Sequence, residues 1–354
     1  MRIALVPSLV SPMRRAEANG PHAVIVDLAR GLAARGHRIT LYGAAGSDID
    51  GFEVTEIPVE PVAQGAQVGG TPSRAATQAL NRAFAHLFDD IRRDPPDVIS
   101  QHAFDAAAIQ LAEGLPVLHT LHLPPIVPEV VTAARAMRAP LATVSEAARA
   151  TWRAAGVNDL AVLRNGVPDI EPFGGATVPV ALIAGRISPE KGTAMAIRVA
   201  RRAGLAVLVV GDIYDAAYFA SDVEPLLRPG EWIGPVPRRE LSELMARCAV
   251  LLMPVRWDEP FGLVAAEAQM AGCPVVAFRR GALPEVVPDR IGGWLAEPGD
   301  EDGLVAAVHR ARGLDRAAIR SRAVRELGVR QMVNAYERAL LDIAAHDPRV
   351  ARAS

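Results

Sequence analysis

The stretch VLLMPVRWDEPFGLVAAE, residues 250–267, has the pattern of one strand-and-helix unit of an α/β sheet. It begins with the uniformly apolar run Val250–Met253, which has the length of a strand and no polar face. A loop containing Pro and Gly follows, and a helix is expected to begin near Gly262. An all-apolar strand followed by a helix is typical of a parallel sheet that is buried on both faces.

The same alternation of apolar runs and helical patterns extends along the whole chain. Strands are expected at 3–6, 38–42, 98–100, 117–121 and 141–144 in the first half, and at 180–184, 206–210, 231–233, 250–253 and 274–277 in the second. A long helical pattern spans about 71–93, and Ser145 is a natural N-cap for the helix behind it. The predicted fold class is therefore α/β, with doubly wound parallel sheets.

The length of 354 residues suggests two domains, each large enough for its own core. The alternation pauses between Leu163 and Pro179, which we interpret as a linker. We expect a Rossmann-like N-terminal domain at 1–165 and a second at 166–330. A C-terminal helix at 331–354 would pack back on the first domain. Two such domains facing each other bind ligands at the carboxyl ends of their strands, in a central cleft.

Bulk properties exclude several classes of function. A net charge of −2 gives no case for nucleic acid as the main partner. Most of the Arg pairs are expected on solvated helix faces; the pairs are Arg14/Arg15, Arg92/Arg93, Arg201/Arg202 and Arg238/Arg239. The two cysteines, Cys248 and Cys273, fit the core of a protein from a reducing compartment.

The sequence also bears on location. The N-terminus lacks a signal-peptide pattern, and no apolar run approaches the ~18 residues that span a bilayer. We therefore expect a cytoplasmic protein. Four arginines would allow at most peripheral contact with lipid headgroups, although solvated helix surface is the favoured interpretation; they are Arg135, Arg138, Arg149 and Arg153.

Two carboxylates bracket the loop-to-helix junction of the opening stretch. Glu259 lies before the expected helix and Glu267 about two turns inside it, which separates them by roughly 12 Å at ~1.5 Å per residue. That distance is too long for a shared acid/base or metal clamp, but it suits two parts of one extended ligand. The backbone N–H groups of 262–264 between them form an anion site.

A second loop, residues 184–192 (AGRISPEKG), follows the first strand of the second half. Gly185 lets the backbone turn, and Arg186 and Lys191 place two cations in one loop. Taken alone, this is a helix-capping turn with exposed cations. Beside the acidic stretch, it favours the binding of a diphosphate.

Together these motifs resemble the retaining glycosyltransferases of family 4, the glycosyl transferases group 1. The C-terminal motifs that carry the resemblance are 185–192, 259–268, 272–277 and 283–287, and weaker N-terminal matches lie at 31–41, 96–99, 145–146 and 165–167. The resemblance covers roughly residues 1–310. It implies the two-domain GT-B architecture and a hexosyltransferase-type enzyme of class EC 2.4.

The resemblance implies the chemistry as well. The donor would be a nucleotide-diphosphate sugar, with a UDP- or GDP-sugar as the first choice, and the sugar would pass to an acceptor hydroxyl with retention of configuration. No metal and no cofactor are expected. The acceptor would be a glycan, a small molecule or a lipid-linked sugar.

The resemblance also assigns roles to individual residues. Arg186 and Lys191 would neutralise the leaving diphosphate, Glu259 would hold sugar hydroxyls and Glu267 the ribose. His122, after a strand of the first half, would face the donor sugar. The other donor-binding residues would be Gly20, Gly185, Phe261, Gly262, Leu263, Val264 and, near the nucleobase, Val236. Leu263 and Val264 are equally good core residues, so their share would be mostly through the backbone.

The first half departs from the family near its N-terminus. Where the family commonly has two glycines and then an acid, this chain has Asn19, Gly20, Pro21 and His22. The change puts the acceptor in doubt. Asn19 and His102, which follows another strand, are candidates for the acceptor side, whereas His119 is expected to be structural.

Two Asp-x-Asp patterns, 48–50 and 300–302, match the motif of metal-dependent glycosyltransferases, but turn chemistry and an N-cap explain them. A sugar phosphorylase is disfavoured because no lysine site for pyridoxal phosphate stands out. Two alternatives stay open. They are a GT-B-fold sugar-nucleotide epimerase and a catalytically silent protein that binds a sugar nucleotide.

Overall fold

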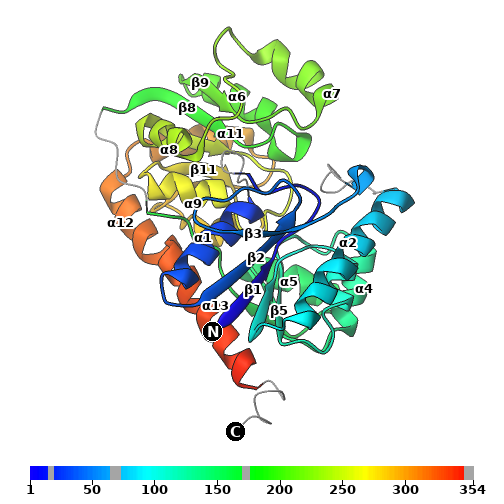
Figure 1. Ribbon diagram of the computed structural model, residues 1–354. Helices are drawn as coiled ribbons and strands as arrows, with labels where there is room; N and C mark the ends of the chain where they lie inside the picture. The colour runs from blue at the N-terminus through cyan, green and yellow to red at the C-terminus, as the bar shows by residue number, and fades with distance from the viewer. Residues whose placement is uncertain (15–19, 64–72, 170–175, 347–354) are drawn as a thin grey trace. The chain divides into compact units, whose positions relative to one another are not determined.

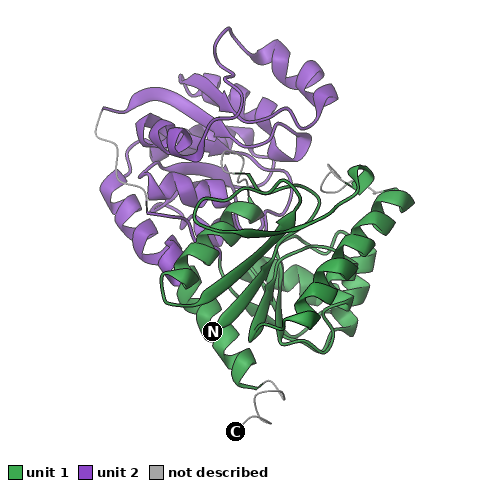
Figure 2. Cartoon of the chain, in the orientation of Figure 1, with its two compact units in different colours: residues 1–164, 332–354 green, residues 165–331 purple. Residues whose placement is uncertain are grey.

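The computed structural model describes residues 1–14, 20–63, 73–169 and 176–346. The chain divides into two compact units. Unit 1 comprises residues 1–164 and 332–354, and unit 2 comprises residues 165–331 (Figure 2). The chain thus leaves unit 1 after Arg164 and returns to it at Met332.

Within the described residues, unit 1 contains a sheet of seven parallel strands in the order β3-β2-β1-β4-β5-β6-β7. The strands are β1 (Arg2–Val6), β2 (Arg38–Ala44), β3 (Val54–Ile57), β4 (Val98–Gln101), β5 (Val117–Leu121), β6 (Leu141–Thr143) and β7 (Leu160–Val162). This order runs outward from β1 to β3, then returns to β4 on the other side of β1. It is the order of a doubly wound nucleotide-binding fold.

The helices of unit 1 cover both faces of this sheet, with α1 and α13 on one side and α2 and α4 on the other (Figure 1). They are α1 (Pro21–Ala33), α2 (Arg74–Arg93), α3 (Ala106–Gln110), α4 (Pro128–Ala136), α5 (Glu146–Ala154) and α13 (Val329–Ala345), with a 3-10 turn η1 (Pro61–Ala63). The expected N-cap is confirmed, because Oγ of Ser145 accepts the N–H of Ala148 at 2.9 Å. Ser73 caps α2 in the same way, and the expected start at 71–72 lies outside the described residues.

Unit 2 contains a second parallel sheet, in the order β12-β11-β10-β8-β9. Its strands are β8 (Val178–Ala184), β9 (Ala206–Val210), β10 (Cys248–Met253), β11 (Val275–Phe278) and β12 (Gly293–Ala296). The helical segments are η2 (Pro189–Lys191), α6 (Thr193–Arg202), α7 (Ala216–Tyr218), η3 (Phe219–Val223), η4 (Glu224–Leu226), α8 (Arg238–Arg247), α9 (Leu263–Met270), α10 (Leu283–Val286), α11 (Glu301–Ala311) and α12 (Arg316–Leu327). An apolar cluster of this unit packs α6 and α11 on the sheet.

One expected strand is wrong. Residues 231–233 do not form a strand; Trp232 makes only an isolated parallel bridge to Val209. The side chains of Trp232 and Ile233 are both exposed, so this position lacks the burial that a full strand requires. If this bridge is counted as the third strand of unit 2 in sequence, after β8 and β9, the six positions of its sheet follow the order 3-2-1-4-5-6, which is also the order of the first six strands of unit 1.

The C-terminal helix α13 begins in unit 2 and belongs to unit 1 from Met332 onward. A Cβ on Gly31 of α1 would lie 2.3 Å from the side chain of Val333, so α1 and α13 pack together closely at this glycine. Farther along, Tyr336 is fully buried and donates a hydrogen bond to Thr120 of β5 at 3.2 Å.

Two doubly wound parallel sheets in one chain confirm the predicted fold class. In the part of the chain that the structure describes, no helix is both long enough and apolar enough to cross a bilayer.

Candidate functional site

The candidate site of unit 2 lies where the strand order reverses, between β8 and β10. In such sheets the loops after the two central strands diverge, and ligands bind at the carboxyl ends there. The loop after β8 carries Arg186 and Lys191, and the loop after β10 carries Glu259. The topology therefore brings both sequence motifs together at the carboxyl ends of two neighbouring strands, β8 and β10.

Close backbone packing joins these two loops. Gly192 has φ +71°, and a Cβ on it would lie 2.3 Å from the carbonyl oxygen of Pro254. The N–H of Arg256 donates to the carbonyl of Glu190 at 2.7 Å. Only glycine fits at residue 192, because any side chain would both strain the backbone and push the loops apart.

Arg186 lies between a carboxylate and two aromatic rings. Its guanidinium bonds Oε1 of Glu190, with Nε at 3.1 Å and the second nitrogen at 2.9 Å. It also lies 4.6 Å from the ring centre of Tyr214 and 6.0 Å from that of Trp257. Stacking of this kind suits the flat, weakly hydrated guanidinium.

Glu190 is held ionised. Burial alone would raise the pKa of its carboxyl, but the hydrogen bond from Ser188, at 2.6 Å, and the charge of Arg186 outweigh it and lower the pKa. Arg186 thus has a negatively charged partner, Glu190, in the free protein.

Lys191, Glu259 and Trp257 form the centre of the site. Oε2 of Glu259 accepts hydrogen bonds from Nζ of Lys191 at 2.8 Å and from the indole N–H of Trp257 at 2.7 Å. The ammonium also lies 5.1 Å from the Trp257 ring centre. Among the described residues, Oε1 of Glu259 has no hydrogen-bond partner. One carboxylate oxygen is therefore fixed and the other is available to a ligand.

The helix α9 begins as expected, at Leu263, after Gly262 in the left-handed region at φ +91°. No side chain among the described residues caps its first turn, so the N–H groups of 262–264 face outward from the helix end. Phe261 is buried, and Leu263 and Val264 are half-buried. Their side chains are packing residues, and any contact with a ligand is through the backbone.

Glu267 lies inside α9 and pairs with Arg238 of α8, with Nε of the arginine 2.9 Å from Oε1. Arg238 is therefore not one of the solvated arginines that most of the Arg pairs were expected to be. Its side chain is 29% exposed and that of Glu267 is 13% exposed. A motif search does not find this pair, since α8 and α9 are separated by β10 in sequence.

Three glycines follow one another across the strand ends of unit 2. The N–H of Gly185 donates to Val210, the N–H of Gly211 donates to Gly234, and a Cβ on Gly211 would lie 2.0 Å from the carbonyl of Gly185. Bare backbone at Gly185 and Gly234 allows a flat ligand to approach closely. Val236 is half-buried two residues beyond Gly234.

In unit 1, His102 and His122 are brought together at the ends of β4 and β5. Nδ1 of His102 lies 2.8 Å from Nε2 of His122, and Nε2 of His102 lies 2.9 Å from Oγ of Ser100. The His102 ring also stacks on Tyr336, with ring centres 5.7 Å apart. Burial lowers the pKa of His122 to about 4 and, together with the charge of His122, lowers that of His102 well below its usual value. Both rings are neutral at pH 7.

His119 is fully buried on β5, and both of its ring nitrogens lack a hydrogen-bond partner among the described residues. Burial lowers its pKa to about 4. A neutral buried ring fits the structural role expected for His119.

The altered N-terminal loop is only partly described. Gly20 is exposed at the start of α1 with φ +55°, and a Cβ there would meet nothing within 4 Å. Its backbone conformation, and not crowding, explains the glycine. Asn19 lies outside the described residues. His22 is on α1, and burial lowers its pKa.

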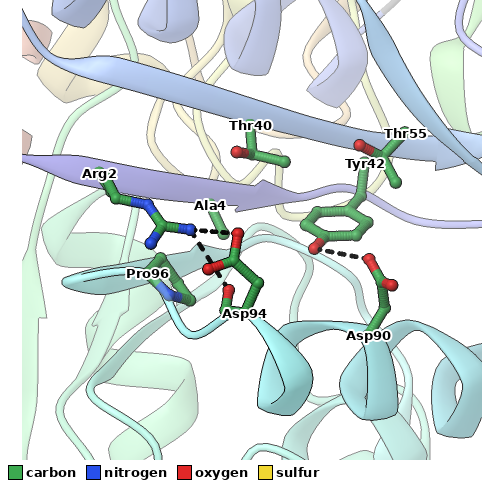
Figure 3. A pocket seen from close by; sticks show the side chains of 8 residues that line it. All are labelled: Arg2, Ala4, Thr40, Tyr42, Thr55, Asp90, Asp94 and Pro96. Atoms are coloured by element: carbon green, nitrogen blue, oxygen red, sulfur yellow. Dashed lines mark hydrogen bonds and ion pairs between the residues drawn. The ribbon is translucent and has the colours of Figure 1, made fainter.

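A separate pocket of about 160 Å³ lies under α2, near the amino ends of β1 and β2 (Figure 3). Arg2 and Asp94 are paired there at 2.6 Å, and the hydroxyl of Tyr42 donates to Asp90 at 3.2 Å. Its charged groups are already paired, and its lining comes from the sheet face beneath α2 and not from the loops that follow β1, β2 and β3.

The Asp-x-Asp patterns have local explanations. Oδ1 of Asp300 accepts the N–H of Gly303 at 2.8 Å and caps α11, as expected. Asp48 makes an isolated bridge to Arg14. Three of the four arginines that were weighed as a lipid-facing set, against the favoured interpretation of solvated helix surface, have partners. Arg149 pairs with Glu146, and Arg135 and Arg153 bond backbone carbonyls.

Known structures share this fold. AviGT4, a glycosyltransferase involved in avilamycin A biosynthesis, is 22% identical with a TM-score of 0.71, and the similarity covers 98% of each chain. Anabaena Alr3699/HepE, solved in complex with UDP-glucose, is 17% identical with a TM-score of 0.75 and covers 97% of this chain and 100% of its own.

Curated relatives match over shorter stretches. A D-inositol 3-phosphate glycosyltransferase of Mycolicibacterium smegmatis is 32% identical over 184 residues, which is 47% of this chain and 42% of the relative. A glycogen synthase of Mycobacterium tuberculosis is 32% identical over 165 residues, 43% of this chain and 40% of the relative. The chain thus spans about two fifths of the length of these relatives.

Two family models match successive parts of the chain. The model "Glycosyltransferase Family 4" matches residues 18–169, and the model "Glycosyl transferases group 1" matches residues 174–317. The first match falls mainly in unit 1 and the second in unit 2, where the Arg186, Lys191 and Glu259 cluster lies. The chain belongs to the family 4, group 1 glycosyltransferases, with the GT-B fold.

Proposed function

We propose that this protein transfers a sugar from a nucleotide-diphosphate sugar to an acceptor hydroxyl, with retention of configuration and without a metal. The observation that carries the proposal is the cluster at the ends of β8 and β10. There, Lys191 bonds the carboxylate of Glu259, and Arg186 lies in the same loop as Lys191, paired with Glu190. Glu259 itself precedes the N-terminus of α9.

The electrostatics of the cluster support a diphosphate as the ligand. Arg186 and Lys191 each have a carboxylate partner, Glu190 and Glu259, which keeps the cations in place in the free protein. A diphosphate brings two or more negative charges and a better match to the guanidinium fork than one carboxylate oxygen. The N-terminus of α9 adds outward-facing N–H groups.

The two glutamates would then contact the two ends of the donor. Oε1 of Glu259 would accept hydrogen bonds from sugar hydroxyls, while Lys191 and Trp257 hold Oε2. Glu267, aligned by Arg238, would accept the ribose hydroxyls. The nucleobase would lie against the bare backbone at Gly234, near Val236.

The reaction breaks the bond between the anomeric carbon and the diphosphate oxygen and forms a bond from that carbon to the acceptor oxygen. Arg186 and Lys191 stabilise the charge that develops on the leaving diphosphate. For retention, the acceptor attacks from the side that the diphosphate leaves. Its proton passes to a phosphate oxygen.

The first test is a panel of donors. UDP-glucose comes first, because the similar Anabaena protein was solved with it, followed by GDP-, ADP- and dTDP-glucose. A ligand at 100 times its Kd stabilises a protein by about 2.7 kcal/mol, which a thermal-shift assay detects. The donor that binds is then assayed for transfer or slow hydrolysis, with and without EDTA, and the product anomer is read by NMR.

Each outcome decides between the alternatives. Release of nucleoside diphosphate with a retained anomer, in the presence of EDTA, supports the proposal in full. Binding without turnover identifies a silent sugar-nucleotide binder, and conversion of the donor to its epimer identifies an epimerase. Glu259→Gln should abolish turnover, whereas Glu297→Gln, which changes an exposed glutamate paired with Arg279, should not.

A further inference from the structure

A chain of hydrogen bonds in unit 1 runs from Ser100 through His102 to His122. The links are 2.9 Å from Oγ of Ser100 to Nε2 of His102 and 2.8 Å from Nδ1 of His102 to Nε2 of His122. All three residues are buried, at 0%, 3% and 6% exposure. Both ring nitrogens of His102 are therefore engaged in hydrogen bonds, one with Ser100 and one with His122.

Ser100 determines which group donates and which accepts in each of these hydrogen bonds. Among the described residues, Ser100 Oγ has no hydrogen-bond partner other than His102. If His102 donated to Ser100, the hydroxyl proton of a fully buried serine would have no acceptor, and an unsatisfied buried donor is costly. The hydroxyl therefore donates to Nε2 of His102, which must be unprotonated.

The remaining proton positions follow. A neutral imidazole carries one proton, so His102 carries it on Nδ1 and donates it to Nε2 of His122. His122 then accepts on Nε2 and carries its own proton on Nδ1. Among the described residues, Nδ1 of His122 has no partner, and the ring keeps a small exposed fraction.

We propose that Ser100 and His102 are positioning residues that fix His122 in its Nδ1–H tautomer, so that His122 offers a neutral hydrogen-bond donor, and not a base, to an oxygen of a bound ligand. A hydroxyl or phosphate oxygen fits such a donor. That this ligand is the substrate of glycosyl transfer rests on the proposed function; the tautomer does not.

The surroundings favour neutral rings. Burial lowers the pKa of both histidines, and charging both rings would place two like charges on nitrogens 2.8 Å apart. The ring of Tyr336 stacks on His102 and restricts its orientation. A neutral N–H donor assists binding without exchanging protons with the acceptor.

The test is NMR of the whole protein labelled with ¹⁵N-histidine, because ring nitrogen shifts distinguish the two neutral tautomers and the charged form. At pH 7 we expect His102 and His122 both to be neutral Nδ1–H tautomers. His122 protonated on Nε2, or on both nitrogens, would overturn the proposal. The measurement needs no turnover, so its failure and that of the proposed function are distinguishable.

Variants sharpen the assignment. Ser100→Ala removes the hydroxyl that sets the direction, and we expect both histidines to become mixtures of tautomers. The matched control is Ser242→Ala, which removes an equally buried hydroxyl, 2% exposed, from unit 2, where Oγ donates to the carbonyl of Arg238. Unchanged tautomers in Ser100→Ala would contradict the role of Ser100.

A functional readout applies once a donor is known. The amide of His122→Asn presents an N–H close to the position of Nδ1, whereas that of His122→Gln lies closer to Nε2. We expect His122→Asn to keep kcat within about tenfold, and His122→Gln to lose about 100-fold. Equal losses of kcat in His122→Asn and His122→Gln, with a shifted pH profile, would indicate that His122 acts as a base and would contradict the proposal.

Discussion

Nζ of Lys191 lies 2.8 Å from Oε2 of Glu259, although 68 residues separate them in sequence. The pair joins the loop after β8 to the loop after β10. A diphosphate that binds Lys191 must therefore compete with Glu259, and a sugar hydroxyl that binds Glu259 acts on the same pair. If a nucleotide sugar binds here as proposed, its binding at one end is coupled to the geometry at the other end.

Removing the indole N–H of Trp257 tests this coupling. Trp257→Phe keeps a ring beside Lys191 but leaves Oε2 of Glu259 with one donor fewer. We expect kcat to fall roughly 10- to 100-fold, since hydrogen bonds to charged groups contribute about 1.5–3 kcal/mol. The Kd of the nucleoside diphosphate alone, measured by calorimetry, should rise slightly, because Oε2 of Glu259 is then held by Lys191 alone and competes more strongly for its ammonium. Trp294→Phe is the control; an unchanged kcat in Trp257→Phe would show that Glu259 needs no alignment.

Arg186 should not be replaceable by lysine. Arg186→Lys keeps the charge but loses the fork and the stacking on Tyr214, 4.6 Å away. We expect the Kd for the nucleoside diphosphate to rise about tenfold or more, with little change for the nucleoside, which has no phosphate. Arg239→Lys, at a side chain that is 84% exposed, should leave both constants unchanged. An equal loss of nucleoside binding would contradict a phosphate-specific role.

Gly192 offers a matched comparison with Gly204. Both have φ near +71°, but only Gly192 is crowded: its Cβ would lie 2.3 Å from Pro254, while a Cβ on Gly204 would meet nothing within 4 Å. Alanine at Gly204 should cost about 1 kcal/mol for the backbone conformation alone. Alanine at Gly192 should cost a further 1–3 kcal/mol, roughly, because the loops must separate. Urea unfolding measures both free energies, and equal losses would falsify the crowding argument.

Glu337 of α13 predicts a pH dependence of the stability of unit 1. The hydrogen bond from His37, at 2.8 Å, and then the bond from Arg35 lower its pKa below the ordinary value of 4.5. A depressed pKa in the folded state contributes stability above about 4.5, and this contribution is lost as the pH falls through the folded value. The difference in urea midpoint between wild type and Glu337→Gln should therefore shrink from pH 6 to pH 3. A constant difference would contradict the linkage.

Much of the fold follows from local pattern. Long apolar runs such as 117–121 and 250–253 are strands, as predicted, because a strand covered on both faces must be apolar throughout. Three short strands, β3, β7 and β12, escaped prediction. Their sequences, VTEI, LAV and GWLA, are too short to show a period, and they become strands by pairing with a neighbour that is already in place.

The sequence predicts which loops and which helix carry the site residues, but it does not predict which side chains contact one another there. Arg186, Lys191, Glu259 and Glu267 are on the expected loops and helix, since Gly and Pro punctuation fixes those boundaries. Tyr214, which lies beside Arg186, and Arg238, which pairs with Glu267, come from other segments, and only the folded sheet brings them close. Trp257 lies two residues before Glu259 in the same loop, but its hydrogen bond to that glutamate leaves no sequence signal. The pairing of His102 with His122 had a usable signal, because each follows one of two neighbouring parallel strands.

The division of the chain makes unit 2 an insertion into unit 1. The last helix of unit 1, α13, is synthesised only after all of unit 2, yet its Tyr336 is fully buried and bonded to Thr120. On the ribosome, unit 2 can complete its fold first, while the sheet face of unit 1 that α1 and α13 share is covered by α1 alone until α13 is made (Figure 1). Unit 1, which contains the first residues to be synthesised, is therefore the last of the two units to complete its fold.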